Sequence, residues 1–226
     1  MSSLPVPAPA LPYARTPFYL ALLLLAGLAG FYPSYLARLD RTDLVHHAHA
    51  LTAFAWMSLL VLQATLIRLR RRPLHRAIGR TAFVLVPLLI ASGLVMAWGM
   101  VHADNPFARA FGPRLAVVDL TAMAGFATFF VLAIKHRRNI HLHARYMAAT
   151  GLLILPPALA RLAVNTVPGV KGFTMTFHVG YLLTELVVAA MLLQAWRSRQ
   201  PARPFVLLLA LLVLQEIGFW AGVAVR

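Results

Sequence analysis

Seven apolar stretches, each about as long as a bilayer is thick, alternate with short polar segments along this chain. A spanning helix needs roughly 20 predominantly apolar residues. The stretches cover residues 17–36, 44–67, 81–103, 115–134, 143–166, 173–196 and 204–225. The pattern predicts an all-α integral membrane protein folded as a bundle of seven transmembrane helices.

Helix-breaking residues interrupt two of the stretches. Gly27, Gly30 and Pro33 make the first stretch the weakest of the seven and predict a kink near its end. Pro156 and Pro157 lack the N–H groups that a helix interior needs, so the fifth helix should break locally and free backbone carbonyls.

Composition supports the membrane class. The 226 residues are 61% hydrophobic and only 12% charged, which is too apolar to cover a water-soluble surface. The chain has no cysteine, which excludes disulfides, thiolate metal sites and cysteine nucleophiles. A net charge of +15 would suggest a nucleic-acid partner in a soluble protein, but here the arginines fall mostly between spans, so none is expected.

The basic residues also predict the orientation. Most of the 21 Lys and Arg residues lie in the N-terminal tail and in the second, fourth and sixth loops, with the densest block at residues 68–80. Cytoplasmic loops carry such an excess, so the N-terminus is expected in the cytoplasm and the C-terminus outside. The block at 68–80 is secondarily a candidate for binding lipid headgroups. Residues 1–16 should form a flexible tail before a single transmembrane domain at 17–226.

Nine histidines fall into two layers at opposite faces of the predicted bundle. The outer layer holds His46, His47, His49, His102 and His178. The inner layer holds His75, His136, His141 and His143, beside the basic loops. Histidines at helix ends are often only interfacial, but His46 and His49 share one helix face and are candidates for holding a metal or a haem.

Polar residues inside the spans gather near the outer layer. The sixth helix carries Thr174, His178, Tyr181 and Glu185 on one face. Asp119 on the fourth helix and Glu216 on the seventh are the other buried carboxylates. Since ionisable groups in a membrane should face the bundle interior, these faces predict a polar pocket that opens outward.

Two of these intramembrane residues have both a structural and a functional interpretation. Arg161 is expected as a counter-ion to a membrane carboxylate or, less simply, as a substrate ligand. His178 is a functional candidate by its depth, although a structural hydrogen bond to Asp119 or Glu185 would also explain it.

Leu74-His75-Arg76-Ala77-Ile78-Gly79-Arg80, preceded by a histidine-led helix with Trp56 and Gln63, forms a distinctive pattern with His143-Ala144-Arg145-Tyr146-Met147. Residues 44–165 thereby resemble an uncharacterised family of bacterial multi-pass predicted membrane proteins, which implies a location in the bacterial plasma membrane. The layout is also distantly similar to that of dihaem membrane b-type cytochromes.

The main hypothesis for function is electron transfer by haem b with a redox partner. His49 and His178 form the candidate outer ligand pair, and His75 and His143 the candidate inner pair, each holding iron between two neutral imidazoles.

Two alternatives stay open, so whether the chain is an enzyme is undecided. The first is a zinc-dependent membrane hydrolase of a lipid-like substrate, with the metal held by three of His46, His49, His102, Asp119 and His178. The second is a transporter or an assembly subunit whose polar faces, including Arg161, Tyr181, Glu185 and Glu216, line a pathway or bind a partner.

Overall fold

The computed structural model describes residues 13–224, with side chains to residue 221, and this part of the chain is helical without strands. The helices are α1 (Thr16–Phe31), the 3₁₀ helix η1 (Leu36–Arg41), α2 (Leu44–Arg68), α3 (Arg72–Gly79), α4 (Ala82–His102), α5 (Pro106–Lys135), α6 (Ile140–Leu152), α7 (Leu155–Thr166), α8 (Phe173–Arg197) and α9 (Arg203–Ala224). The predicted all-helical class is confirmed.

Five helices in the described chain are long and apolar enough to cross a membrane: α2, α3 with α4, α5, α8 and α9. The pair α6 and α7 adds a sixth span if its 43° bend is counted as one broken crossing. The first predicted span is only the 16-residue α1, which ends at Phe31, just before Pro33. The chain is therefore an integral membrane protein. By helix length and apolar composition, its described part contains five or six candidate spans, fewer than the seven predicted.

Asparagine and aspartate side chains fix the starts of three helices. Asp43 accepts from the His46 N–H at 2.9 Å, and Asn105 accepts from the Ala108 N–H at the same distance. Asn139 caps α6 through the N–H groups of His141 and Leu142. These bonds satisfy N–H groups that the helix itself leaves without acceptors, so short loops can end one span and begin the next.

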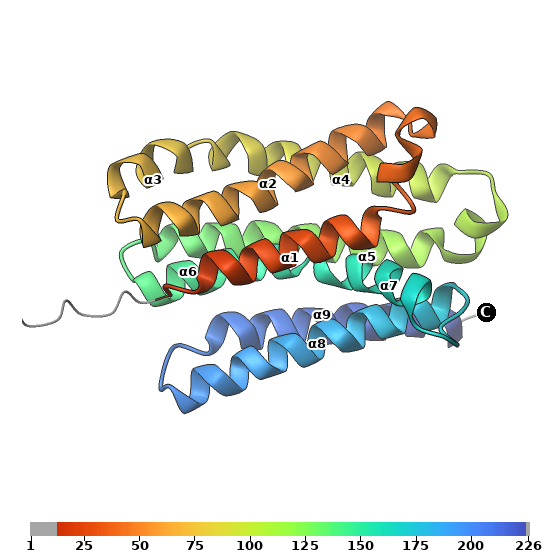
Figure 1. Ribbon diagram of the computed structural model, residues 1–226. Helices are drawn as coiled ribbons and strands as arrows, with labels where there is room; N and C mark the ends of the chain where they lie inside the picture. The colour runs from red at the N-terminus through yellow and green to blue at the C-terminus, as the bar shows by residue number, and fades with distance from the viewer. Residues whose placement is uncertain (1–12, 225–226) are drawn as a thin grey trace, which may run out of the picture.

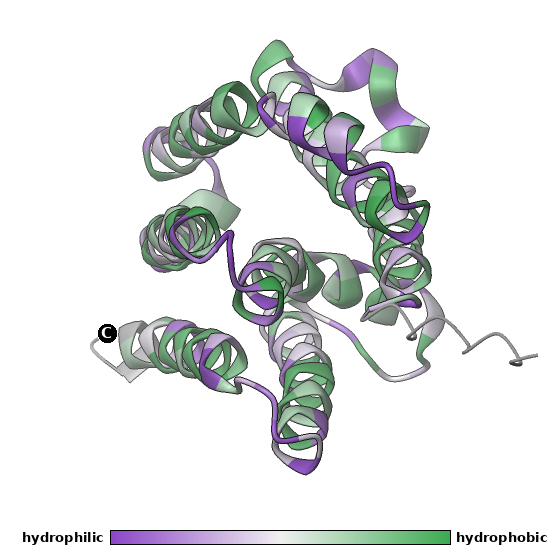
Figure 2. Cartoon of the chain, turned by 90° about the vertical axis from the view of Figure 1, so that its left-hand side faces the viewer, coloured by the Kyte–Doolittle hydropathy of each residue, from purple (hydrophilic) through white to green (hydrophobic). Residues whose placement is uncertain are grey.

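The helices form a bundle in which the α6–α7 pair lies in the middle and packs on α1, α2, α5, α8 and α9 (Figure 1 and Figure 2). On one side, α2 and α4 pack on α5 around the buried Trp56, whose ring meets Phe126 and Phe130 edge-on. On the other side, α6, α8 and α9 pack around Phe129, Tyr146 and further buried residues. Many large apolar side chains on the outer faces are exposed, as expected where lipid rather than water surrounds a helix.

Basic loops gather at one end of the bundle. The turns that follow α2, α5 and α8 lie together at the left of Figure 1, and Figure 2 views this end, where the connecting segments are purple and the helices behind them largely green. We call it the basic end. The six Asp and Glu residues lie elsewhere: Asp40, Asp43 and Asp104 in the connections at the other end, and Asp119, Glu185 and Glu216 within helices.

Candidate functional site

Gln215 joins three helices inside the bundle. Its side-chain oxygen accepts a hydrogen bond from the Tyr181 hydroxyl on α8 at 3.2 Å. Its amide nitrogen donates to the Val118 carbonyl at 3.1 Å and to the Thr121 hydroxyl at 3.3 Å, both on α5. Gln215 and Tyr181 are both buried, so this network ties α9 to α8 and α5 at the level where the polar residues lie.

The three intramembrane carboxylates lie within electrostatic range of this network. Asp119 on α5, Glu185 on α8 and Glu216 on α9 all lie close enough to the Tyr181 phenol to interact with it electrostatically. Sequence spacing placed Tyr181 and Glu185 on one helix face, and the fold adds the carboxylates of two further helices. We call Tyr181 and the three carboxylates, Asp119, Glu185 and Glu216, the carboxylate site. The outward-opening polar pocket stays a prediction.

His178 and Glu185 lie two turns apart on α8, and both interact with Glu216 of α9. His178 forms a hydrogen bond through Nδ1 with Glu216. The structural alternative predicted Asp119 or Glu185 as this partner. Glu185 has a buried oxygen, Oε1, with no hydrogen-bond partner among the described residues. An unsatisfied carboxylate oxygen inside a membrane is costly, which favours a functional reason for keeping it.

The break between α6 and α7 lies against the carboxylate site. A Cβ atom on Gly180, the residue before Tyr181, would lie 2.4 Å from the Pro156 carbonyl oxygen and 2.7 Å from Ala160 Cβ. α7 therefore crosses α8 in backbone contact at this point. The predicted effect of the two prolines is confirmed, because the helix stops at Leu152 and resumes at Leu155 with a bend of 43°.

Arg161 does not pair with a carboxylate among the described residues, so its interpretation as a counter-ion is wrong. Its guanidinium donates to the Pro157 carbonyl at 2.9 Å and lies over the Phe31 ring at 4.6 Å. The carbonyl of Arg161 in turn accepts from the Asn165 amide. Its guanidinium thus contacts a backbone carbonyl of its own helix and an aromatic ring of α1.

Each outer histidine on α2 has its own partner. His46 binds the helix-capping Asp43 at 2.7 Å, and the His46 backbone N–H and imidazole together lower the pKa of that carboxyl group. His47 binds the Tyr35 hydroxyl at 2.9 Å, and His49 binds the Ser92 hydroxyl at 3.1 Å.

The proposed zinc ligands therefore do not assemble. His102, on α4, stacks on Trp98, while His178 and Asp119 belong to the carboxylate site. Among the described residues, no three His, Asp or Glu side chains come together as a metal site.

The two histidine pairs predicted to hold haem differ in how close the fold brings their members. His49 lies on α2 and His178 on α8, which Figure 1 shows on opposite sides of the bundle. His75 and His143 lie close enough to interact electrostatically, and their Nδ1 atoms contact the backbone carbonyls of Gln63 at 3.3 Å and Ala133 at 2.9 Å. The fold thus brings the inner pair together but not the outer pair.

Two glycines position the site through close helix contacts, a role that was not predicted for either of them. Gly30 on α1 approaches α7 so closely that a Cβ there would lie 2.3 Å from the Ala158 carbonyl oxygen. Together with Gly180 it holds α7 from two sides. Small residues mark close helix contacts in membranes, so the many alanines and glycines of these helices were the available signal.

Comparison with known proteins gives one match of interest. Over 203 residues, the chain is 29% identical to the Na(+)/H(+) antiporter NhaA 2 of Myxococcus xanthus (strain DK1622), a match that covers 78% of this chain and 40% of the antiporter. The chain thus spans less than half the length of this relative. No family model and no solved structure matches.

This relative and the geometry correct the main functional hypothesis. Haem-linked electron transfer is wrong, because the similarity is to an antiporter and no haem or metal site forms among the residues that the structure describes. The likeness to b-type cytochromes is likewise unsupported. Binding of haem b or zinc as such stays a prediction. The apolar spans and the antiporter relative indicate an integral protein of the bacterial plasma membrane.

Proposed function

We propose that this chain is a transporter, or the core of one, that exchanges protons for a small monovalent cation. The observation that carries the proposal is the carboxylate site, where Asp119, Glu185 and Glu216 from three helices all lie within electrostatic range of Tyr181. Ionisable groups inside a membrane are expensive and commonly mark ion or proton pathways. Carboxylates that release a proton and then attract a cation provide the chemistry that such an exchange needs.

The broken helix supports this proposal. Pro156 and Pro157 have no N–H, so the carbonyls of Leu152 and Leu153 lose their usual donors four residues further on. Secondary transporters use interrupted helices of this kind to offer backbone carbonyls to a cation near the middle of the membrane. Here the interruption touches α8 one residue away from Tyr181.

The proposal includes seven crossings, with the N-terminus in the cytoplasm and the C-terminus outside. It counts α1 and the bent α6–α7 pair as one crossing each, in addition to the five longer spans. Support comes from the basic end, because positive loops are retained on the cytoplasmic side (Figure 2).

The test is cation-driven proton movement in liposomes that contain the purified full chain. A pH-sensitive dye inside the liposomes should report proton efflux when Na⁺, Li⁺ or K⁺ is added outside. Asp119→Asn, Glu185→Gln and Glu216→Gln should each reduce this signal toward that of protein-free liposomes, because an amide cannot carry the proton. Asp40→Asn, which removes an exposed carboxylate outside the spans, serves as the matched control.

Two results would contradict the proposal. The first is a wild-type signal no larger than that of protein-free liposomes for all three cations. The second is full activity in all three amide variants, since proton exchange would then not use the carboxylate site.

A further inference from the structure

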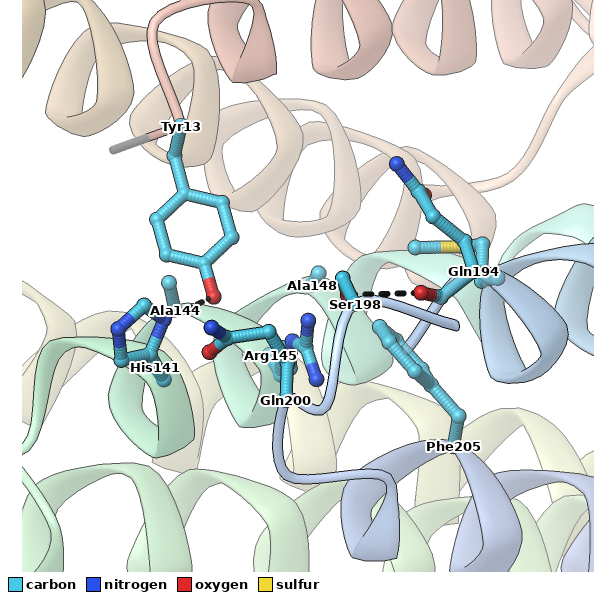
Figure 3. Close-up of a pocket in the computed structure, with 10 residues that line it drawn as sticks. Tyr13, His141, Ala144, Arg145, Ala148, Gln194, Ser198, Gln200 and Phe205 are labelled. Atoms are coloured by element: carbon cyan, nitrogen blue, oxygen red, sulfur yellow. Dashed lines mark hydrogen bonds between the residues drawn. The ribbon is translucent and has the colours of Figure 1, made fainter. Parts of the chain in front are cut away.

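A cavity of about 270 Å³ opens at the basic end, far from any acidic side chain in the sequence. It lies between the turn before α1, helix α6 and the connection from α8 to α9. Its polar lining comes from Tyr13, His141, Arg145, Gln194, Ser198 and Gln200 (Figure 3). The outward pocket predicted from the sequence does not account for this cavity, because the cavity belongs to the opposite end of the bundle.

Arg145 is the unusual member of this lining because it is buried, with only 8% of its surface exposed. Its guanidinium donates one hydrogen bond, to the Pro201 carbonyl, and stacks over the Phe205 ring at 5.5 Å. A guanidinium has five N–H donors and is charged at any physiological pH. Most of its donor capacity therefore remains for another acceptor.

None of the acidic side chains in the part of the chain that the structure describes forms an ion pair with Arg145. Three of the six acidic residues lie in connections at the other end, and the other three form the carboxylate site. The loops beside Arg145 add further positive charge through Arg137, Arg199 and Arg203. A buried cation without a counter-ion is strongly unfavourable, so the site calls for an anion from outside the chain.

The other side chains of the cavity suit an oxyanion. The Tyr13 hydroxyl is 2.8 Å from His141 Nδ1. When the hydroxyl donates this bond, the hydrogen of the imidazole lies on Nε2, where it is a free donor. In Figure 3, Tyr13, His141, Arg145 and Gln200 lie together at the cavity, so imidazole, guanidinium and amide donors converge there.

We propose that this cavity binds a phosphate group, held chiefly by Arg145 with His141 and Gln200. Arginine recognises phosphate through two parallel N–H···O bonds, which a point charge does not offer. The phosphate is either free inorganic phosphate or that of an anionic lipid headgroup, which the cytoplasmic leaflet would present at this depth. The site shares no residue with the carboxylate site and does not depend on the transport proposal.

The experiment uses the full chain, purified in an uncharged detergent. One arm titrates inorganic phosphate by calorimetry. The other adds phosphatidylglycerol, or an uncharged diacylglycerol with the same acyl chains, and counts bound lipid by native mass spectrometry. The variants are Arg145→Lys, which keeps the charge but not the paired donors, and His141→Ala, which leaves Arg145 in place in case the buried position does not tolerate change. Arg138→Gln, at an exposed position in the connection from α5 to α6, removes a charge from the same end as the control.

Either of two results supports the proposal. Phosphate affinity that falls about tenfold or more in Arg145→Lys and His141→Ala but not in Arg138→Gln would show a free-phosphate site, since the loss of one charge-assisted hydrogen bond costs about that factor in affinity. Selective retention of phosphatidylglycerol with the same variant pattern, and no phosphate binding, would identify the headgroup as the source. Binding of neither probe would overturn the proposal. An equal loss in Arg138→Gln would also overturn it, because attraction would then come from the general charge of the basic end.

Discussion

At the scale of single residues, Gln215 and Tyr181 show why polar side chains persist in an apolar bundle. Gln215 is 3% exposed and reaches α5 and α8 from α9. No water is present in the hydrocarbon region to satisfy such groups, so each hydrogen bond must be made within the protein. The bonds between Tyr181, Gln215 and α5 therefore hold three helices in register around the carboxylates.

Tyr181→Phe should destabilise the protein by about 0.6–1.7 kcal/mol, the range measured for hydrogen bonds between membrane helices. The substitution removes the donor that Gln215 Oε1 accepts from while leaving the aromatic packing intact. Unfolding in mixed detergent would measure the change. Tyr19→Phe, at an exposed position on α1, is the control, and an equal effect of the two substitutions would contradict a role for the network.

At the scale of elements, α7 owes its position to the absence of side chains on its neighbours. Gly30 on α1 and Gly180 on α8 allow backbone contacts on both sides of this short helix. The prolines at its start separate it from α6, so α7 can tilt away from the line of α6. This geometry brings the interruption beside Tyr181 and connects the break to the carboxylate site.

Gly180→Ala should destabilise the protein by about 1–3 kcal/mol, as other overpacked sites do. The added methyl would meet the Pro156 carbonyl and Ala160, and backbone atoms cannot move aside as a flexible side chain can. Gly27→Ala is the matched control, because a Cβ there meets nothing within 4 Å. Thermal unfolding in detergent should separate the two, and a Gly180→Ala protein as stable as the control would refute the close packing of α7 on α8.

At the scale of the whole molecule, charge is divided along the bundle axis. Arginines and lysines concentrate in the connections at the basic end, while Asp40, Asp43 and Asp104 lie in the connections at the other end (Figure 2). Such a division is the usual signature of orientation in the membrane. It also leaves Arg145 in a region without carboxylates, which is the basis of the phosphate site.

The orientation can be tested directly because the chain contains no cysteine. In intact bacterial cells, a membrane-impermeant maleimide should label Asp40→Cys but not Arg138→Cys. Arg138→Cys should become reactive only after the inner membrane is permeabilised. Labelling in the reverse order would show that the basic end faces outward and that the positive residues do not set the topology.

The sequence predicted those features that depend on local composition. Each predicted stretch contains a helix. In the hydrocarbon region no water satisfies the backbone N–H and C=O groups, so an apolar stretch of about 20 residues must satisfy them within its own helix. The break at Pro156 and Pro157 was equally local. The partners of His178 and Arg161 were not predictable, since helical spacing says which residues share a face but not which neighbouring helix that face meets.

What the sequence by itself determined is thus the helical membrane class and the uneven charge of the loops, which follow from hydropathy and from the positions of arginines. Only the folded chain brings Asp119, Glu185 and Glu216 within electrostatic range of Tyr181. Only the fold places the buried Arg145 in a cavity whose described lining has no acidic side chain. The physical reason is that lipid solvates every apolar helix face alike. The choice of neighbours therefore rests on close packing at small residues and on a few buried hydrogen bonds between distant parts of the chain.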